Sequence, residues 1–402
     1  MTGVEGSVKA FASDRNYSLI TAILFWSGLA VVSSLYITIP MVAVFTADFQ
    51  LTTAQAAWSS SAFSSCYALG VLAFGPLSDR YGRKQIMLFG LGILAMVTPI
   101  IGLMHGFTWL VVLRAIQGAA AATFAPTAVA YVMEFYPVGK RVSAIGIVSS
   151  SFLMSGIAGQ VFSSFMIAQF SWSSVFYTLG VVYFITAILT AFFLPANQTE
   201  HQAGGRHADS NQLKAIAVNY PLLCCYTIAL MLLLSFVGMY TALGSYLSNE
   251  FHLSEQQILY VRSTGMIGML LAPFAGRFVD RFGMLRVLRG GVLLAVFGLA
   301  VLGFTSSLAL LVIVSVVFVS GISVTVPTLI SLVGHLGGQA RGLAVALYTF
   351  ILFLGATLGP IIAVSLLKTG SYLLTFELLA ILLGIGLASA FIIRLQKERK
   401  HQ

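Results

Sequence analysis

The sequence predicts an all-α integral membrane protein with twelve transmembrane helices in two pseudo-symmetric six-helix bundles. The 402-residue chain is 58% hydrophobic with a mean hydropathy of +0.96, well outside the range of soluble domains. Apolar runs of about 20 residues, the length that crosses a bilayer, follow one another almost end to end. The motif Gly-x-x-x-Asp-Arg-aromatic-Gly begins at Gly75 and again at Gly276, 201 residues later, which indicates a duplication.

The apolar runs and the residues that interrupt them predict six spans in each half of the chain. The first six spans cover residues 18–44, 54–77, 84–104, 107–133, 141–168 and 172–195. The second six cover residues 218–247, 255–278, 286–304, 308–333, 341–367 and 371–393. Residues 196–217 are polar and predict a flexible cytoplasmic linker between an N-terminal bundle, 1–195, and a C-terminal bundle, 218–402.

The basic residues predict the orientation, because lysine and arginine favour the cytoplasmic side of a membrane. With twelve spans, eighteen of the 21 basic residues lie on the side of both termini, Lys368 lies on the other side, and Arg114 and Arg262 lie inside spans. We therefore expect a protein of the cytoplasmic (inner) membrane with both termini in the cytoplasm, residues 1–17 forming a tail and not a cleaved signal peptide. This distribution accounts for the net charge of +9 without nucleic acid as a partner.

The charged motif at residues 75–84 joins spans 2 and 3 and predicts a gate at the cytoplasmic face. Gly75 permits close approach of another helix, and Gly82 permits a tight turn. Asp79 lies at the end of a span, where an ion pair or a helix N-terminus can hold the two bundles together. Its candidate partners for an ion pair are Arg80, Arg83 and Arg141.

For Arg83 and Lys84 the alternative is that their charges only set topology and bind anionic headgroups of the lipid bilayer. The second copy of the motif supplies the pseudo-symmetric counterparts of the gate. These counterparts are Gly276, Asp280, Arg281 and Gly283.

The motif resembles the signature of the major facilitator superfamily, roughly Gly-x-Leu-Ala-Asp-Arg-x-Gly-Arg-Lys, with Ser78 in the alanine position. In span 4, Arg114-Ala115-Ile116-Gln117-Gly118 resembles the Arg-x-x-x-Gly element of that family's proton-coupled exporters. The resemblance implies two bundles that move against each other and a small organic substrate exchanged for protons, as in the drug/proton antiporter branch. Span 5 lacks the proline of the exporters' Gly-Pro-x-x-Gly-Gly element and span 1 lacks an acidic residue, so the direction of transport stays open.

Three charged residues lie inside spans, where a charge costs about 2.5–3.5 kcal/mol or more unless it is paired or hydrated. Arg114 shares a helical face with Gln117, so it can bind an anionic or carbonyl group, modulate a proton site, or cap carbonyls of neighbouring helices. Arg262 and Glu377 can form a structural pair, or Glu377 can accept a proton. The resemblance places span 12 at the periphery, which argues against Glu377 lining the pathway.

The same resemblance places spans 1, 4, 7 and 10 around a central cavity, with Tyr36 and Gln117 as candidate substrate contacts. Aromatic cavities with few charges suit amphiphilic organic compounds. Glu134 and His335 hold corresponding positions at the cytoplasmic ends of spans 4 and 10. Together with Arg141 they are candidate residues of a cytoplasmic gate, although a lone histidine at a helix end is commonly structural.

Enzymatic classes find no support, because the sequence lacks His-Glu-x-x-His, Gly-x-Ser-x-Gly and phosphate-loop motifs. Cys66, Cys224 and Cys225 fall in spans without metal or disulfide spacing, so we expect no metal or cofactor. The predicted function is secondary active export of a small organic molecule in exchange for protons, by a monomer that works through alternating access. An uptake symporter or facilitator, and a ligand sensor that does not transport, remain the alternatives.

Overall fold

The computed structural model describes residues 14–195 and 218–393, and all regular elements in these ranges are helices. The predicted linker, residues 1–13 of the predicted N-terminal tail and residues 394–402 lie outside the described residues, whereas residues 14–17 of that tail belong to α2. The first half contains α2 (Asp14–Ser33), α3 (Val42–Asp48), α4 (Thr53–Ala56), α5 (Trp58–Tyr81), α6 (Arg83–Gly102), α7 (Phe107–Ala121), α8 (Ala125–Phe135), α9 (Val138–Gln169) and α10 (Trp172–Phe193). The second half contains α12 (Tyr220–Asn249), α13 (Glu255–Met269), η1 (Ala272–Phe274), α14 (Ala275–Phe282), α15 (Met284–Gly303), α16 (Leu308–Leu336), η2 (Gly338–Ala340), α17 (Arg341–Leu367) and α18 (Tyr372–Ile392).

The predicted membrane architecture is confirmed by the length and composition of these helices. Within the described ranges, eleven helical segments are long and apolar enough to cross a membrane, and residues 17–33 form a shorter apolar helix. The shorter helix continues through a turn into α3, which completes the first span. The fold is therefore an all-α membrane protein with twelve spans.

Four spans that the sequence predicts as continuous are interrupted, and three of the interruptions lie next to a proline. Between α2 and α3, residues 34–41 form successive turns that include Pro40. The break between α7 and α8 precedes Pro126, and η1, which separates α13 from α14, contains Pro273. Proline lacks a backbone donor and its ring clashes with the preceding turn of a helix, which favours breaks at these three places. The fourth interruption, at Ala57 between α4 and α5, has no proline beside it, and Pro76, Pro99, Pro327 and Pro360 lie inside continuous helices.

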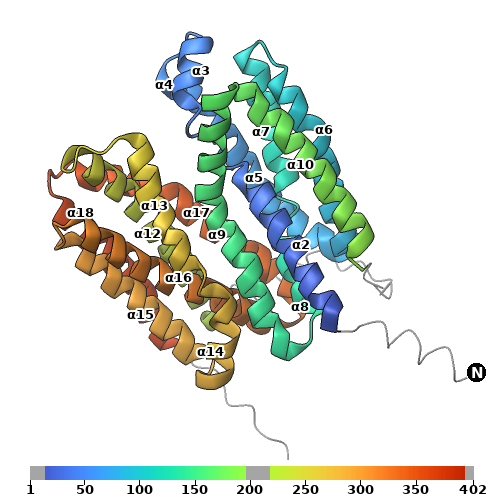
Figure 1. The fold of residues 1–402 in the computed structure, drawn as a ribbon. Helices are drawn as coiled ribbons and strands as arrows, with labels where there is room; N and C mark the ends of the chain where they lie inside the picture. The colour runs from blue at the N-terminus through green and yellow to red at the C-terminus, as the bar shows by residue number, and fades with distance from the viewer. Residues whose placement is uncertain (1–13, 196–217, 394–402) are drawn as a thin grey trace, which may run out of the picture.

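The helices form two bundles that meet along a central interface (Figure 1). In the first bundle α5 packs on α7, α6 on α10 and α2 on α9, and in the second α12 packs on α17 and α18, and α15 on α16. Across the interface α5 contacts α17, whereas α9 contacts α13, η1, α14 and α16. The two crossings correspond to each other under the sequence duplication, so the interface repeats the pseudo-symmetry of the chain.

We call the end of the molecule where α5 meets α6 and α14 meets α15 the signature end. Gly82 and Gly283 form these two turns with φ of 94° and 85°, a region of backbone conformation that favours glycine. The opposite end of the first bundle carries α3 and α4, at the top of Figure 1. There the Trp172 indole donates a hydrogen bond to Asp48 over 2.9 Å.

Candidate functional site

The first copy of the charged motif is the end of helix α5 and not a loop, since α5 continues to Tyr81 and α6 begins at Arg83. The short connection folds the Arg83 side chain back against the last turn of α5, where it is 5% exposed. Its Nη2 donates to Glu134 Oε1 of α8 over 2.7 Å and forms an ion pair with Asp79. Its Nη1 donates to the hydroxyl of Ser78. A single buried arginine thus connects α5, α6 and α8.

The same motif contacts the other bundle through Gly75 and Asp79. A Cβ atom added to Gly75 would collide with the Cβ atom of Ala346 in α17. The Asp79 carboxylate lies against Gly342, the second residue of α17. A negative charge at this position is favoured by the partial positive charge of the α17 N-terminus. The Arg83 cluster therefore lies at the contact between the bundles.

The second copy of the motif makes the matching contact by packing alone. Gly276 lies so close to Ser143 of α9 that a Cβ atom would meet its backbone nitrogen at 2.8 Å. Asp280 and Arg281 are exposed, and Asp280 makes no ion pair within 14–195 and 218–393. Arg281 lies over the ring of Phe282, as Arg80 lies over Tyr81 in the first copy. The predicted symmetry of the gating motif therefore holds for its backbone and glycines but not for its charges.

Two basic residues at the signature end cap helices of their own bundle. Lys84 Nζ donates to the Ala191 carbonyl at the end of α10 over 2.6 Å. Arg289 donates to the Ala390 and Ile393 carbonyls at the end of α18, over 3.0 and 3.1 Å. Basic side chains stabilise helix C-termini, so both have a structural explanation within a bundle. In the sequence, nothing distinguishes Arg289 from the other basic residues that follow the second copy of the motif.

The turns after α8 and α16 place the other predicted gate residues. Arg141 donates to the Tyr136 carbonyl over 2.8 Å, and Arg341 donates to the Gly334 carbonyl over 2.9 Å in the second bundle. Arg141 therefore braces a turn instead of pairing with Asp79. His335 is exposed, while the preceding Gly334 packs against Met133 of the first bundle.

Tyr136 fastens the turn after α8 to the first helix of its bundle. Its hydroxyl lies 2.8 Å from Thr21 Oγ1 and donates to the Tyr17 carbonyl over 3.1 Å. Burial raises the pKa of Tyr136 to about 12, and the Thr21 hydrogen bond opposes that shift. The phenol is therefore neutral at physiological pH and acts here as a hydrogen-bonding group.

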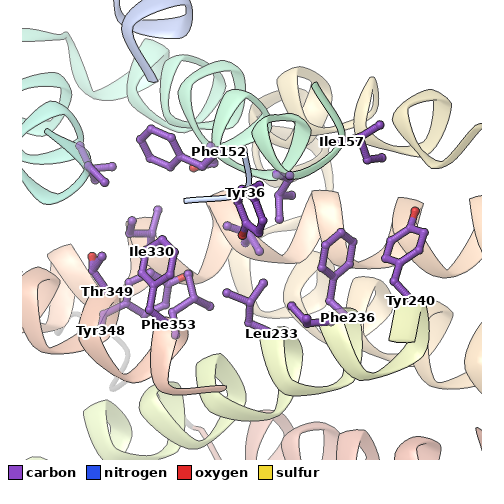
Figure 2. A pocket seen from close by; sticks show the side chains of 18 of the residues that line it. Tyr36, Phe152, Ile157, Leu233, Phe236, Tyr240, Ile330, Tyr348, Thr349 and Phe353 are labelled. Carbon is purple, nitrogen blue, oxygen red and sulfur yellow. The ribbon is translucent and has the colours of Figure 1, made fainter. Parts of the chain in front are cut away.

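A cavity of about 120 Å³ lies between the bundles near the middle of the spans (Figure 2). Its walls come from α9 and the turn after α2 in the first bundle, and from α12, α13, α16 and α17 in the second, with α8 contributing small residues. The lining is mostly apolar and aromatic. Its aromatic members are Tyr36, Phe152, Phe236, Tyr240, Tyr348 and Phe353.

The cavity is closed from the signature end by tight glycine contacts between the bundles. Gly75 packs on Ala346, Gly276 on Ser143, and Gly146 of α9 on the Ala272 carbonyl. All of these contacts lie in the signature-end half of their helices, beyond the cavity. The structure therefore shows one conformation in which the bundles are joined at one end.

Arg262 and Tyr36 line the cavity, as their assignment to a pathway requires. Arg262 Nη2 donates to the Tyr240 carbonyl over 2.9 Å, whereas its buried Nε has no hydrogen-bond partner within the described residues. Glu377 does not line the cavity and makes no ion pair with Arg262. The structure thus does not support the predicted Arg262–Glu377 pair, because the arginine turns to a carbonyl of α12.

Arg114 and Gln117 do share a face, but that face points into the first bundle and not into the cavity. Both side chains are fully buried. Arg114 donates to the carbonyls of Ser59 and Ser34, over 3.2 and 2.9 Å, and to Gln117 Oε1 over 2.6 Å. Gln117 in turn donates to Thr98 over 2.8 Å. These contacts favour a structural role that joins helices of the first bundle, and neither residue contacts the cavity in this conformation.

Glu377 lies near Gly303 in the second bundle, within 3.3 Å of where a Cβ atom on that glycine would stand. Its Oε1 atom is buried and has no hydrogen-bond partner among the residues described. A buried carboxylate oxygen without a partner carries a desolvation cost that protonation removes. The position therefore fits a proton-accepting group better than a structural pair.

Comparison with known proteins agrees with this architecture. A transporter of Buchnera aphidicola subsp. Schizaphis graminum is 28% identical over 351 residues, covering 86% of this chain and 84% of the relative. The inner membrane transport protein YnfM of Escherichia coli is 26% identical over 287 residues, covering 68% and 65%. The crystal structure of the human organic anion transporter MFSD10 (TETRAN) superposes with a TM-score of 0.74 at 15% identity, covering 93% of this chain and 99% of that one.

The likeness to the MFSD10 structure shows the fold, whereas a family model shows the family. The model of the Major Facilitator Superfamily matches residues 24–339 and 226–402. These matches include both copies of the charged motif and every residue that lines the cavity. The chain therefore belongs to the Major Facilitator Superfamily and is an integral membrane transporter, not an enzyme.

Proposed function

We propose that this protein is a secondary active exporter that moves a small organic molecule across the cytoplasmic membrane by alternating access, in exchange for protons. The observation that carries the proposal is the cavity between the bundles, beside which close glycine contacts join the two bundles toward the signature end. Transporters of this architecture bind substrate near the midplane and expose it by rocking one bundle against the other.

The orientation follows from the basic residues that cluster at the signature end, which we assign to the cytoplasm. Both termini then lie in the cytoplasm, and the structure represents a state closed toward the cytoplasm. The proposed units are the bundles 1–195 and 218–402, joined by the linker 196–217 in a monomer. The name of the Escherichia coli relative supports placement in the inner membrane.

The groups proposed to exchange protons are the carboxylates of Asp79 and Glu377. Protonation of Asp79 would weaken its ion pair with Arg83 and its attraction to the α17 N-terminus, and so loosen the gate. Glu377 offers a buried carboxylate oxygen that has no hydrogen-bond partner in the part of the chain that the structure describes. A proton that moves down the membrane potential releases about 2.3 kcal/mol per 100 mV, and a tenfold substrate gradient requires about 1.4 kcal/mol. One proton per cycle therefore suffices for useful export.

Cross-linking across the signature end tests alternating access directly. In a variant without native cysteines, Met133→Cys and Gly334→Cys would place two thiols at the contact between α8 and α16, because the flexible end of the Met133 side chain occupies the space beside Gly334. We expect their disulfide to stop transport of a panel of labelled amphiphilic compounds, and reduction to restore it. A matched pair inside the second bundle, Met231→Cys with Gly386→Cys, joins α12 to α18, where a Cβ atom on Gly386 would stand 3.4 Å from that of Met231. This pair leaves the bundle interface free and should leave transport intact. Full transport by the cross-linked interface variant would contradict the proposal.

A further inference from the structure

Within residues 14–195 and 218–393, three polar atoms in the walls of the central cavity have no hydrogen-bond partner, unlike most buried polar groups. They are Arg262 Nε, the Tyr348 hydroxyl and the Ser149 hydroxyl, all buried and all on cavity-lining residues. A buried donor that is left unpaired costs about 1–3 kcal/mol, and more when it is charged. The three groups come from α13, α17 and α9, so three walls of the cavity carry unpaired polar atoms directly behind their surface.

The charge of the cavity has one sign. Arg262 is the one charged residue among those that line the cavity, all of which lie within the described ranges, and no carboxylate lines it. Among the residues that the structure describes, its guanidinium donates one hydrogen bond, to the neutral carbonyl of Tyr240. A guanidinium so enclosed attracts an anion, and its planar fork matches carboxylate and sulfonate geometry.

The polar groups stand at two ends of the cavity. Arg262 follows the first residue of α13 by seven positions, and α13 begins at the end of the molecule opposite the signature end. Tyr348 follows the first residue of α17 by seven positions, and α17 begins at the signature end. Each residue therefore lies about 10 Å along its helix from the end where that helix begins. Figure 2 shows Tyr240, the backbone partner of Arg262, at one side of the cavity and Tyr348 and Thr349 at the other. Phe236 and Tyr36 lie between them. The cavity thus offers a cationic end, an aromatic middle and a hydroxyl-bearing end.

We infer that the substrate is a small organic monoanion with an apolar ring, whose anionic group binds Arg262 and whose ring lies among the aromatic side chains. This inference rests on the proposed function and assigns the substrate class of that same cavity. The cavity of about 120 Å³ has room for a ring that bears one anionic group. Arg114, the other buried arginine of a span, cannot take this role in the present conformation because it lies outside the cavity.

The test compares three probes of one shape on the purified full-length protein. Benzenesulfonate carries the anion, benzenesulfonamide is its neutral counterpart and benzylammonium carries the opposite charge. We expect benzenesulfonate to raise the unfolding temperature in detergent and to bind about 10- to 100-fold more tightly than the other two, as expected for hydrogen bonds to a charged group. The inference would be overturned if the wild-type protein bound benzenesulfonate and benzenesulfonamide equally, or did not bind benzenesulfonate.

Variants of Arg262 and Lys368 test whether Arg262 is the residue that causes the preference for benzenesulfonate. Arg262→Gln should lose most of the preference for benzenesulfonate, while Arg262→Lys keeps the charge but not the fork and should lose less. Lys368→Gln removes an exposed cation from the same end of the molecule and should bind as the wild type does. An unchanged preference in Arg262→Gln, or its loss in Lys368→Gln, would contradict the assignment.

Transport measurements separate this inference from the proposed function. Binding of benzenesulfonate without its movement across liposomes would contradict the transport proposal and leave the cavity assignment standing. Movement of benzylammonium or of the sulfonamide, unaffected by Arg262→Gln, would contradict the anion assignment and leave the transport proposal standing.

Discussion

At the scale of single residues, the two arginines inside spans show how one residue type acquires two roles. Arg114 has its donors directed at the Ser34 and Ser59 carbonyls and lies over the Phe63 ring at 4.3 Å. The Arg262 side chain has one carbonyl partner and faces the cavity. Since a charge within the bilayer must be paired or functional, the first is explained by structure and the second is available to a ligand.

Replacing Arg114 is therefore expected to damage stability and not selectivity. Arg114→Met removes donors from the Ser59 carbonyl of α5, from the Ser34 carbonyl in the turn after α2, and from Gln117, at about 1–3 kcal/mol for each buried group left unpaired. The unfolding temperature in detergent should fall, and transport by the remaining folded protein should decrease equally for all substrates. Arg114→Lys, which keeps the charge and part of the hydrogen bonding, should lie between. A loss confined to anionic substrates, at unchanged stability, would contradict this account.

At the scale of elements, the two copies of the charged motif have the same backbone and different chemistry. Both turn through a glycine with positive φ, Gly82 or Gly283, and both place a glycine against the other bundle. The first copy adds the cluster of Arg83, Asp79 and Glu134, whereas the exposed Asp280 of the second makes no ion pair within the described residues. In the proposed gate, the electrostatic contacts are therefore on the α5–α17 side.

This asymmetry predicts different outcomes for two equivalent substitutions. Asp79→Asn removes the ion pair with Arg83 and the charge beside the α17 N-terminus, so transport should fall at least about tenfold while the protein still inserts. Asp280→Asn is the matched control and should keep most of its activity. Initial rates in liposomes at equal protein density measure both. Normal activity of Asp79→Asn, or equal losses in the two variants, would contradict the gate assignment.

Much of this element structure could be predicted because it depends on local patterns. The spans follow from apolar length, and the turns at Gly82 and Gly283 follow from glycine's conformational freedom. The break after Ser33 and the orientation of Arg114 could not be predicted. Pro40 alone did not predict the break, because other prolines of this chain lie inside continuous helices. The orientation of Arg114 depends on which face of its helix meets which neighbour, and hydropathy carries little such information in a helix that is apolar all round.

At the scale of the whole molecule, the duplication supplies two bundles whose contacts repeat in pairs, α5 with α17 and α14 with α9. Small residues at these contacts allow close approach without interlocking side chains, which suits surfaces that separate and rejoin. If the substrate is an anion, export of one anion and entry of one proton move charge across the membrane in the same direction. The membrane potential then contributes about 4.6 kcal/mol per 100 mV to each transport cycle.

The measurement that tests the central claim most directly follows protons and substrate together. Purified protein is placed in liposomes that contain a pH dye and are clamped electrically, and a panel of small organic anions, cations and neutral compounds is supplied inside. We predict that an anion leaves while the lumen becomes acidic, and that Asp79→Asn shows neither flux. Alkalinisation of the lumen as the compound leaves would make the protein a symporter. Movement of the compound without any proton flux would make it a facilitator and remove the proton role of Glu377.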